Sequence, residues 1–127
     1  MELSNADSGS RPLVIYVDPS QTMLFLRTLV LESEGFDVIG TIWTSNAREL
    51  IDSQSPALVL VDVFERKDEL TKFLLEIKSA HRDLAIAVLS QDKSLESRAL
   101  ADCVISPQAS MGAFIASLQA LLEKNQN

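Results

Sequence analysis

Five short apolar runs, each followed by a helical pattern, set the architecture predicted for this chain. The runs are continuous, with little polar alternation, as expected of strands buried on both faces of a parallel sheet. The predicted strands are Leu13–Asp18, Phe36–Ile42, Ala57–Asp62, Leu84–Leu89 and Cys103–Ile105. Strand and helix alternate five times, which predicts an α/β fold: a doubly wound, five-stranded parallel sheet with helices on both faces.

The predicted helices carry recognisable start and stop signals. The first begins after Ser20, a good N-cap, and ends before Gly35, which suits a C-terminal stop. The second is capped by Thr44 or Ser45 and runs to about Ser53. Apolar residues at helical spacing predict three more helices, over Leu70–Ile77, over Ser94–Leu100 and from Met111 to Leu122.

Length and composition indicate one domain. The chain has 127 residues, of which 46% are hydrophobic, enough for a sizeable core. Residues 1–11 are polar and are predicted to form a flexible N-terminal tail, residues 12–124 the domain, and residues 125–127 a C-terminal tail. Cys103 is the only cysteine, so no intrachain disulfide can form, which suits the reducing cytoplasm.

Charge and hydropathy exclude some classes of partner. The net charge of −7 argues against nonspecific binding to nucleic acid or to an anionic membrane. The N-terminus has no apolar signal-peptide region, and no apolar run is long enough to span a bilayer. We therefore expect a cytoplasmic protein without nucleic-acid or membrane partners.

Polar residues with chemical potential lie where the predicted strands end. Asp18 and Asp62 close two strands, and Ser90 and Ser106 follow two others. In an open parallel sheet, the binding site lies at the carboxyl ends of the strands, near the point where the strand order reverses. Two carboxylates at that edge can hold a divalent cation or accept a phosphoryl group.

Four segments, in the same order and at the same spacing, resemble a response-regulator receiver domain over about residues 12–124. Asp18-Pro19-Ser20-Gln21-Thr22 is similar to the family's Asp-Asp-Ser-x-Thr, and Val59-Leu60-Val61-Asp62 to its phosphoacceptor strand. The segment from Asp83 to Ser90 resembles the fourth strand with its switch hydroxyl, and Val104-Ile105-Ser106-Pro107 the fifth strand with its Lys-Pro pair. The resemblance implies the flavodoxin-like (βα)5 receiver fold.

The resemblance also implies roles for individual residues. Asp62 matches the residue that is phosphorylated, and Asp18 matches the first acid of the metal-binding pair. Ser90 matches the switch hydroxyl. Ser106 falls at the position of a lysine that pairs with the phosphoryl group, and Pro107 at a proline whose preceding peptide bond is cis.

Two of these positions depart from the family pattern in a way that weakens phosphoryl chemistry. Pro19 replaces the second acid, which removes both a metal ligand and a negative charge, so we expect Mg²⁺ to bind weakly, if at all, at Asp18 and Asp62. Ser106 replaces the lysine, and a hydroxyl cannot neutralise a phosphoryl charge. Nearby candidates for compensation are the acids Glu65 and Asp68 and the cations Arg66 and Lys93.

Three function hypotheses from different classes follow. The first is a pseudo-receiver: a protein-interaction module in signal transduction that is neither an enzyme nor conventionally phosphorylated. The second is a working receiver, phosphorylated on Asp62 by a histidine kinase. The third is a nucleotide or small-ligand sensor, which the lack of a glycine-rich phosphate loop disfavours. The expected partner is a signalling protein, either a histidine kinase or a downstream effector, or a second copy of the chain.

The first helix offers a candidate interaction surface. Met23, Leu26 and Val30 form one apolar stripe. Leu24, Phe25 and Leu29 cannot all join it, because consecutive helical residues lie about 100° apart. We therefore select Leu24 and Phe25 as interface candidates, since exposed apolar clusters mark interaction sites. Packing against the last helix is the alternative for both.

Overall fold

The computed structural model describes residues 11–62 and 67–125. Five strands and five helices alternate along them, as the sequence pattern predicts. The strands are β1 (Leu13–Val17), β2 (Asp37–Thr41), β3 (Leu58–Asp62), β4 (Ala85–Leu89) and β5 (Cys103–Ile105). The helices are α2 (Gln21–Ser33), α3 (Thr44–Gln54), α4 (Lys67–Ala80), α5 (Ser94–Ser97) and α6 (Met111–Asn125).

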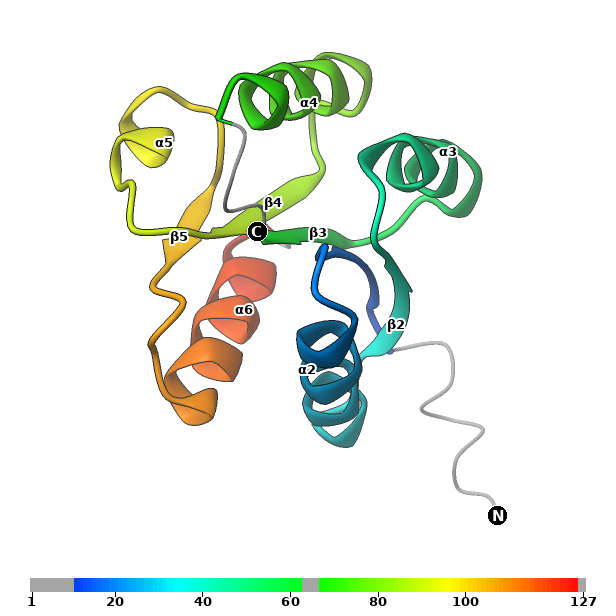
Figure 1. Cartoon of the computed structure of the whole chain (residues 1–127), viewed down its shortest axis with the longest axis vertical. Coiled ribbons are helices and arrows are strands. Elements are labelled where there is room, and N and C mark those ends of the chain that lie inside the picture. The colour runs from blue at the N-terminus through cyan, green and yellow to red at the C-terminus, as the bar shows by residue number, and fades with distance from the viewer. Residues whose placement is uncertain (1–10, 63–66, 126–127) are drawn as a thin grey trace.

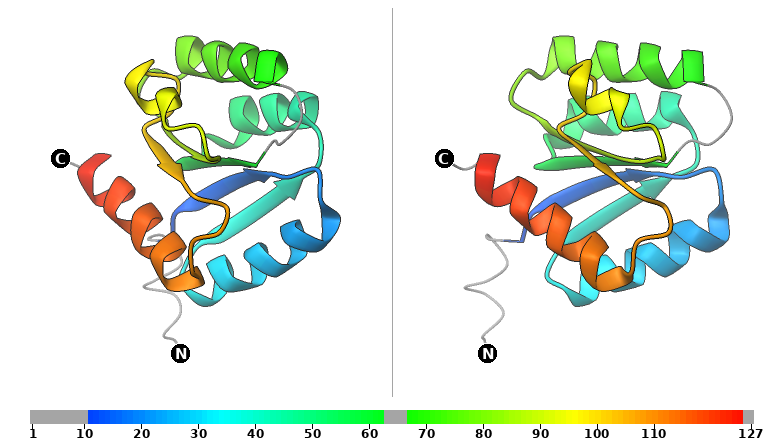
Figure 2. Two further views of the ribbon diagram at one scale, coloured as in Figure 1. Left: turned by 60° about the vertical axis from the view of Figure 1, so that its left-hand side comes forward. Right: turned by 90° about the vertical axis from the view of Figure 1, so that its left-hand side faces the viewer.

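All five strands are parallel, in the order β2-β1-β3-β4-β5. Helices α2 and α6 cover one face of the sheet, and α3, α4 and α5 cover the other (Figure 1). The two further views in Figure 2 show the same three layers. The predicted doubly wound sheet is therefore confirmed.

The strand order reverses between β1 and β3. The chain leaves β1 through α2 to reach the edge strand β2, then returns through α3 on the opposite face to enter β3. The carboxyl ends of β1 and β3 are therefore neighbours from which the chain departs to opposite faces of the sheet. This is the place where a doubly wound sheet forms its binding crevice.

Each face of the sheet has its own apolar core. Residues of the central strands alternate between the two, so Ile15 of β1 packs under α3 and α4, whereas Tyr16 packs under α2 and α6. The strands β3 and β4 are buried along their whole length. This burial on both faces explains why the strands appear in the sequence as continuous apolar runs.

Two predicted helix boundaries are wrong. Residue Trp43, rather than Thr44 or Ser45, is the N-cap of α3, and no side chain caps this helix. The helix predicted to continue to Leu100 ends at Ser97, because Ala99 has a φ of 60°, in the left-handed region that stops an α-helix.

Residues at both ends of the described chain form hydrogen bonds with the rest of the fold. Arg11, assigned to the tail, donates hydrogen bonds to Asp37 Oδ1 at 2.9 Å and to the Phe36 carbonyl at 2.8 Å. Asn125 closes α6 and donates to the Asp83 carbonyl at 3.1 Å. The rest of both predicted tails lies outside the described residues.

Candidate functional site

The two aspartates predicted at the sheet edge are brought together. Asp62 is the last residue of β3, and Asp18 follows β1, whose Val17 is in register with Val61. The backbone N–H of Asp18 donates to the Thr41 carbonyl at 3.0 Å, which extends the pairing with β2. Asp18 is completely buried and Asp62 is 6% exposed. Buried carboxylates need partners, because an isolated charge is costly inside a protein.

Their partner is Arg27 of α2. A single guanidinium nitrogen, Nη1, lies 3.1 Å from Asp18 Oδ2 and 2.9 Å from Asp62 Oδ2. Arg27 is only 6% exposed, and its guanidinium carbon lies 6.0 Å from the centre of the Phe114 ring of α6. Arg27 therefore bridges both aspartates from within the fold, packed beneath the neighbouring helix.

Tyr16 completes the cluster. It precedes Asp18 by two residues on β1, and side chains two apart on a strand point to the same face. The phenol O–H donates to Asp18 Oδ2 at 2.5 Å, and Arg27 Nη1 donates to the phenol oxygen at 3.0 Å. We call Tyr16, Asp18, Arg27 and Asp62 the arginine cluster.

The other oxygen of Asp18 organises the start of α2. Asp18 Oδ1 accepts a hydrogen bond from the Ser20 N–H at 2.9 Å, and Ser20 Oγ accepts one from the Met23 N–H at 3.2 Å. The predicted N-cap at Ser20 is thus confirmed. Exposed Pro19 stands between them, where its missing N–H is not needed. Both oxygens of Asp18 are therefore occupied by the protein itself.

The cluster contains one more negative charge than positive. Burial, followed by the nearby charge of Asp18, raises the pKa of Asp62, although the contacts with Arg27 act in the opposite direction. Burial by itself would lower the pKa of Arg27, but its contacts with Tyr16 and Asp62 outweigh burial, so that pKa is raised and the guanidinium stays charged. Burial and the hydrogen bond to Asp18 raise the pKa of Tyr16, which keeps the phenol neutral.

These residues do not fit the Mg²⁺ ion that receiver domains bind. An ion shared by Asp18 Oδ2 and Asp62 Oδ2 would need the position that Arg27 Nη1 takes between them. Magnesium also requires near-octahedral oxygen coordination, and within the described residues no three acidic, histidine or cysteine side chains gather to supply it. The guanidinium instead supplies a fixed monovalent charge.

The two serines at the other strand ends hold local turns. Ser90 Oγ accepts from the Asp92 N–H at 2.9 Å, and Ser106 Oγ accepts from the Gln108 N–H at 3.2 Å. Neither hydroxyl has a hydrogen bond to Asp62 in the described part of the chain. The two serines lie at the predicted edge of the sheet but serve the loops that follow β4 and β5.

The predicted cis bond before Pro107 is wrong, because the described residues contain no cis peptide bond. The Ala109 N–H donates to the Ser106 carbonyl at 3.0 Å, which closes a four-residue turn with Pro107 at its second position. A trans proline with its fixed φ is favoured at that position. With serine in place of lysine, there is also no long side chain to direct into the site.

Two of the other candidates for compensation, Lys93 and Asp68, are described, and neither forms a contact with the arginine cluster. Lys93 Nζ donates to the Val104 carbonyl at 3.4 Å, and Asp68 is exposed in the first turn of α4. Glu65 and Arg66 lie outside the described residues. Cys103 is half-buried against the core under α6, and burial raises the pKa of its thiol, as expected of a structural cysteine.

The apolar surface of α2 differs from the predicted one. Leu24 is half-buried, and its side chain lies 3.0 Å from where a Cβ on Gly40 would be, so it packs on β2 rather than facing a partner. Phe25 is 64% exposed, Leu29 50% and Leu26 45%. The stripe predicted through Leu26 is wrong, because Arg27 and Leu31 form the fully buried face.

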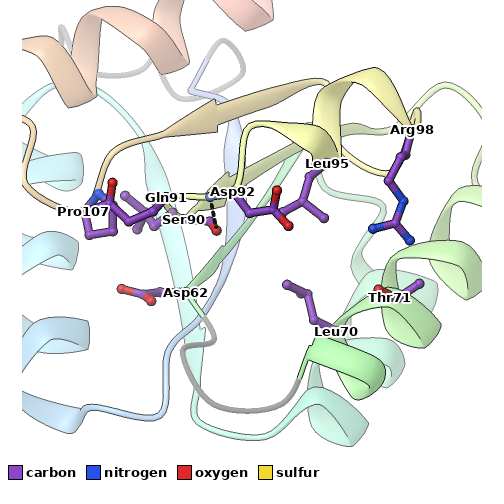
Figure 3. Close-up of a pocket in the computed structure, with 10 residues that line it drawn as sticks. Asp62, Leu70, Thr71, Ser90, Gln91, Asp92, Leu95, Arg98 and Pro107 are labelled. Atoms are coloured by element: carbon purple, nitrogen blue, oxygen red, sulfur yellow. Dashed lines mark hydrogen bonds between the residues drawn. The ribbon is translucent and has the colours of Figure 1, made fainter.

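A cavity of about 690 Å³ opens beside the arginine cluster, between α4 and the loops after β4 and β5 (Figure 3). Asp62, Ser90 and Pro107 lie at one end, whereas Thr71 and Arg98 lie at the other. Its remaining lining residues are Leu70, Leu89, Gln91, Asp92 and Leu95. This size is within the usual range for small-molecule sites.

Comparison with solved structures places this architecture among known folds. A CheY-like receiver domain protein from Methanospirillum hungatei JF-1 matches with a TM-score of 0.80 at 18% identity, over 91% of this chain and 97% of that one. A response regulator from Thermotoga maritima matches with a TM-score of 0.78 at 26% identity, over 89% of this chain and 98% of that one. The chemotaxis response regulator CheY4 of Vibrio cholerae matches with a TM-score of 0.77 at 17% identity, over 87% of this chain and 98% of that one.

The chain has the receiver-domain fold. No family model and no curated protein matches its sequence. The solved structures establish the receiver fold. The receiver fold does assign the arginine cluster to the edge of the sheet at which receiver domains carry their phosphorylation site.

Neither Arg27 nor Tyr16 is predicted as a site residue from the sequence, yet both leave a signal there. Arg27 is the only charged residue from Gln21 to Leu31, and Leu31, one turn further on, shares its buried face. A lone cation on an apolar helix face needs a partner from elsewhere in the fold. Tyr16 alternates with Asp18 on the same strand, which places the two side chains together.

Proposed function

We propose that this chain is a pseudo-receiver: a non-enzymatic signalling module that binds another protein and does not use an aspartyl-phosphate switch. The receiver fold supports a role in signal transduction. The observation that carries the rest is the 2.9 Å contact between Arg27 Nη1 and Asp62 Oδ2. That contact places a fixed cation against Asp62, at the position between the two carboxylates that a divalent metal ion would need.

The electrostatics of the site argue in the same direction. Phosphoryl transfer depends on cations that neutralise the charge of the transferred group. This chain has Ser106 where receiver domains carry a lysine, and its buried Arg27 is already committed to two carboxylates. No described group remains at this edge to stabilise a dianionic phosphoryl group, so a working receiver phosphorylated on Asp62 is the less favoured alternative.

The surface proposed for partner binding is the outer face of α2. Phe25, Leu26 and Leu29 are exposed there, and from Gln21 to Leu31 the only charged residue is the buried Arg27. An uncharged apolar face on a chain of net charge −7 suits an apolar patch on a signalling protein. A second copy of this chain is the alternative occupant. We propose a cytoplasmic location, since a single cysteine, Cys103, suits a reducing compartment. Among the described helices, none is both long and apolar enough to cross a membrane.

Phosphorylation provides the direct test. The chain is incubated with acetyl phosphate and Mg²⁺, and its intact mass is followed beside that of an ordinary receiver domain. We expect no stable phosphoryl adduct on the wild-type chain. Efficient labelling that Asp62→Asn abolishes would reverse the choice between the two hypotheses.

A matched pair of variants tests why labelling fails. Pro19→Asp with Ser106→Lys restores the second acid and the lysine, but we expect it to stay poorly labelled, because Arg27 still binds both aspartates. Adding Arg27→Met to these two substitutions should permit labelling. Equal labelling of the double and triple variants would exclude Arg27 as the obstacle.

The interaction surface is tested separately. Phe25→Ala with Leu29→Ala should weaken binding of a protein partner, or self-association in sedimentation, on the order of thirtyfold, as for a truncated apolar anchor worth about 2 kcal/mol. Asp62→Asn should leave that binding nearly unchanged. A partner lost by Asp62→Asn and retained by the α2 variant would place recognition at the sheet edge instead.

A further inference from the structure

The charge of the arginine cluster is incomplete on the side that faces the cavity. Two buried carboxylates, Asp18 and Asp62, share one guanidinium, so one negative charge has no counterpart within the cluster. Both oxygens of Asp18 accept hydrogen bonds, but the described residues place no donor on Asp62 Oδ1. Asp62 is the member of the cluster that lines the cavity.

The cavity beside Asp62 combines this acidic end with an apolar body. Leu70, Leu89 and Leu95 line it and are each at most 5% exposed, so they present apolar atoms that water reaches only through the cavity. Ser90 also lines the cavity, and its hydroxyl, which accepts from the Asp92 N–H, keeps its own proton to donate.

Arg98 does not neutralise the acidic end. It lies at the far end of the cavity, beside Thr71, and is exposed to solvent (Figure 3). Asp92, the other charged residue of the described lining, is also acidic, and its Oδ1 accepts from the N–H and the hydroxyl of Ser94. The lining also contains no glycine, and a phosphate near Asp62 would be repelled. The chemistry therefore disfavours a nucleotide and favours a cation.

We propose that this cavity binds a small amphipathic amine, whose ammonium group pairs with Asp62 and whose apolar body packs on Leu70, Leu89 and Leu95. The ammonium group supplies a positive charge without displacing Arg27, since it pairs with Asp62 Oδ1, to which no described residue donates. A monovalent group is sufficient, because the cluster lacks only one charge. The apolar body determines which amines bind, because only a chain or ring covers the three leucines.

Phenylpropylamine and phenylpropanol form a matched pair of probes, because they differ in the ammonium group alone. Each is titrated into the ¹⁵N-labelled chain, and the amide shifts of Ser90 and Leu95 are followed. We expect a roughly millimolar Kd for the amine, as for a good ligand of about ten non-hydrogen atoms. The alcohol should bind roughly tenfold more weakly. Equal affinities, or no amine binding up to about ten times that Kd, would overturn the proposal.

Two variants locate the bound amine. Asp62→Asn balances the cluster, so the amine should fall to the affinity of the alcohol while the alcohol is unaffected. Thr71→Trp should fill the end of the cavity away from Asp62 and block binding of both probes. Lys72→Trp, one residue along α4 and outside the described lining, should not. Gln91→Trp serves as the block if Thr71→Trp does not fold. Unchanged amine binding in a folded blocked variant would overturn the site. If acetyl phosphate labelled Asp62, the proposed function would be wrong. The amine titrations use the unphosphorylated chain, so their outcome would still test the amine site.

Discussion

The two halves of the carboxyl edge of the sheet are stabilised by different kinds of contact. At the ends of β1 and β3, two acids persist and are joined through Arg27 into one buried unit. At the ends of β4 and β5, Ser90 and Ser106 bond to the backbone of their own loops. The first half is held by long-range charge, with a separation of 35 residues between Arg27 and Asp62, and the second by contacts two residues apart.

This difference indicates that buried charges at strand ends must be balanced within the fold. A buried carboxylate requires a cation, because it would otherwise be an unpaired charge. In this chain an arginine from the adjacent helix meets that requirement. A strand-end hydroxyl has no such requirement, because a nearby N–H is enough to satisfy it.

Removing the arginine should have the largest effect on this comparison. Arg27→Met keeps much of the side-chain volume but leaves Asp18 and Asp62 without a cation, and breaking a buried pair costs about 3–5 kcal/mol. The measurement is the free energy of unfolding in denaturant. Arg48→Met is the control, because the Arg48–Asp52 pair is exposed and screened by water, and it should change stability little. A loss as small as that of the control would mean that the arginine cluster does not stabilise the fold.

The next largest effect should be stabilisation by Mg²⁺, and it should occur only in the Arg27→Met variant. With Arg27→Met, the two carboxylates become available to a divalent cation with a Kd on the order of 1 mM. At about 10 mM Mg²⁺ the variant should then gain about 1.4 kcal/mol of stability. The wild-type chain should gain nothing, because Nη1 holds the position between the acids. Equal stabilisation of both proteins would show that the metal binds elsewhere.

The pH dependence of stability should differ in sign between a buried and an exposed aspartate. Burial and Asp18 raise the pKa of Asp62 above its ordinary 3.8, so the folded state holds that proton longer, and the contribution of Asp62 falls as the pH rises through its folded pKa. The hydrogen bond from His81 lowers the pKa of Asp52, so its contribution is present above 3.8 and lost as the pH falls.

Denaturant unfolding of Asp62→Asn and Asp52→Asn across this acidic range measures the two trends. Relative to wild type, Asp62→Asn should become more favourable as the pH rises and Asp52→Asn as it falls. If the stability of both variants, relative to wild type, changed in the same direction with pH, the pKa of Asp62 would not be raised in the folded state.

Substitutions at the ends of β4 and β5 should have the smallest effect on the free energy of unfolding. Ser90→Ala and Ser106→Ala each remove one hydrogen bond in a solvated loop, which costs about 0.5–1 kcal/mol. In a double-mutant cycle with Arg27→Met, Ser106→Ala should be additive within about 0.5 kcal/mol, because the two share no partner. Asp62→Asn should be strongly non-additive with Arg27→Met. Strong coupling of Ser106 to Arg27 would show that the two halves still act as one site.

The fold was predictable because strand burial leaves a direct trace in the sequence. Continuous apolar strands such as Ala85–Leu89 predict a sheet covered on both faces, and Gly35, with a φ of 98°, ends α2 where expected. The errors lie where local backbone geometry decides. Ala99 stops α5 with a positive φ that alanine rarely adopts, and Trp43 caps α3 without a polar side chain. Neither feature follows from residue type.

The candidate site was predictable only in part. The positions of Asp18 and Asp62 follow from strand ends, which the apolar runs define. The identity of their partner does not follow from the strand ends or from the motif, because a motif shows which residues differ from the family pattern but not which residue pairs with the acids. Arg27 comes from the helix after β1, nine residues beyond Asp18, at a position to which the resemblance assigns no role. The orientation of Leu24 toward Gly40 likewise depends on how α2 rotates to bury that arginine.

Tyr16 is the only tyrosine of the chain, and it lies inside the arginine cluster. Its phenol is fully buried and its pKa is raised, so it should not ionise in mild alkali while the cluster is closed. Tyrosinate has its own ultraviolet absorption, distinct from that of the single, exposed Trp43. Its appearance during an alkaline titration, or during unfolding at alkaline pH, would therefore report the opening of this one site by absorbance alone, without any label.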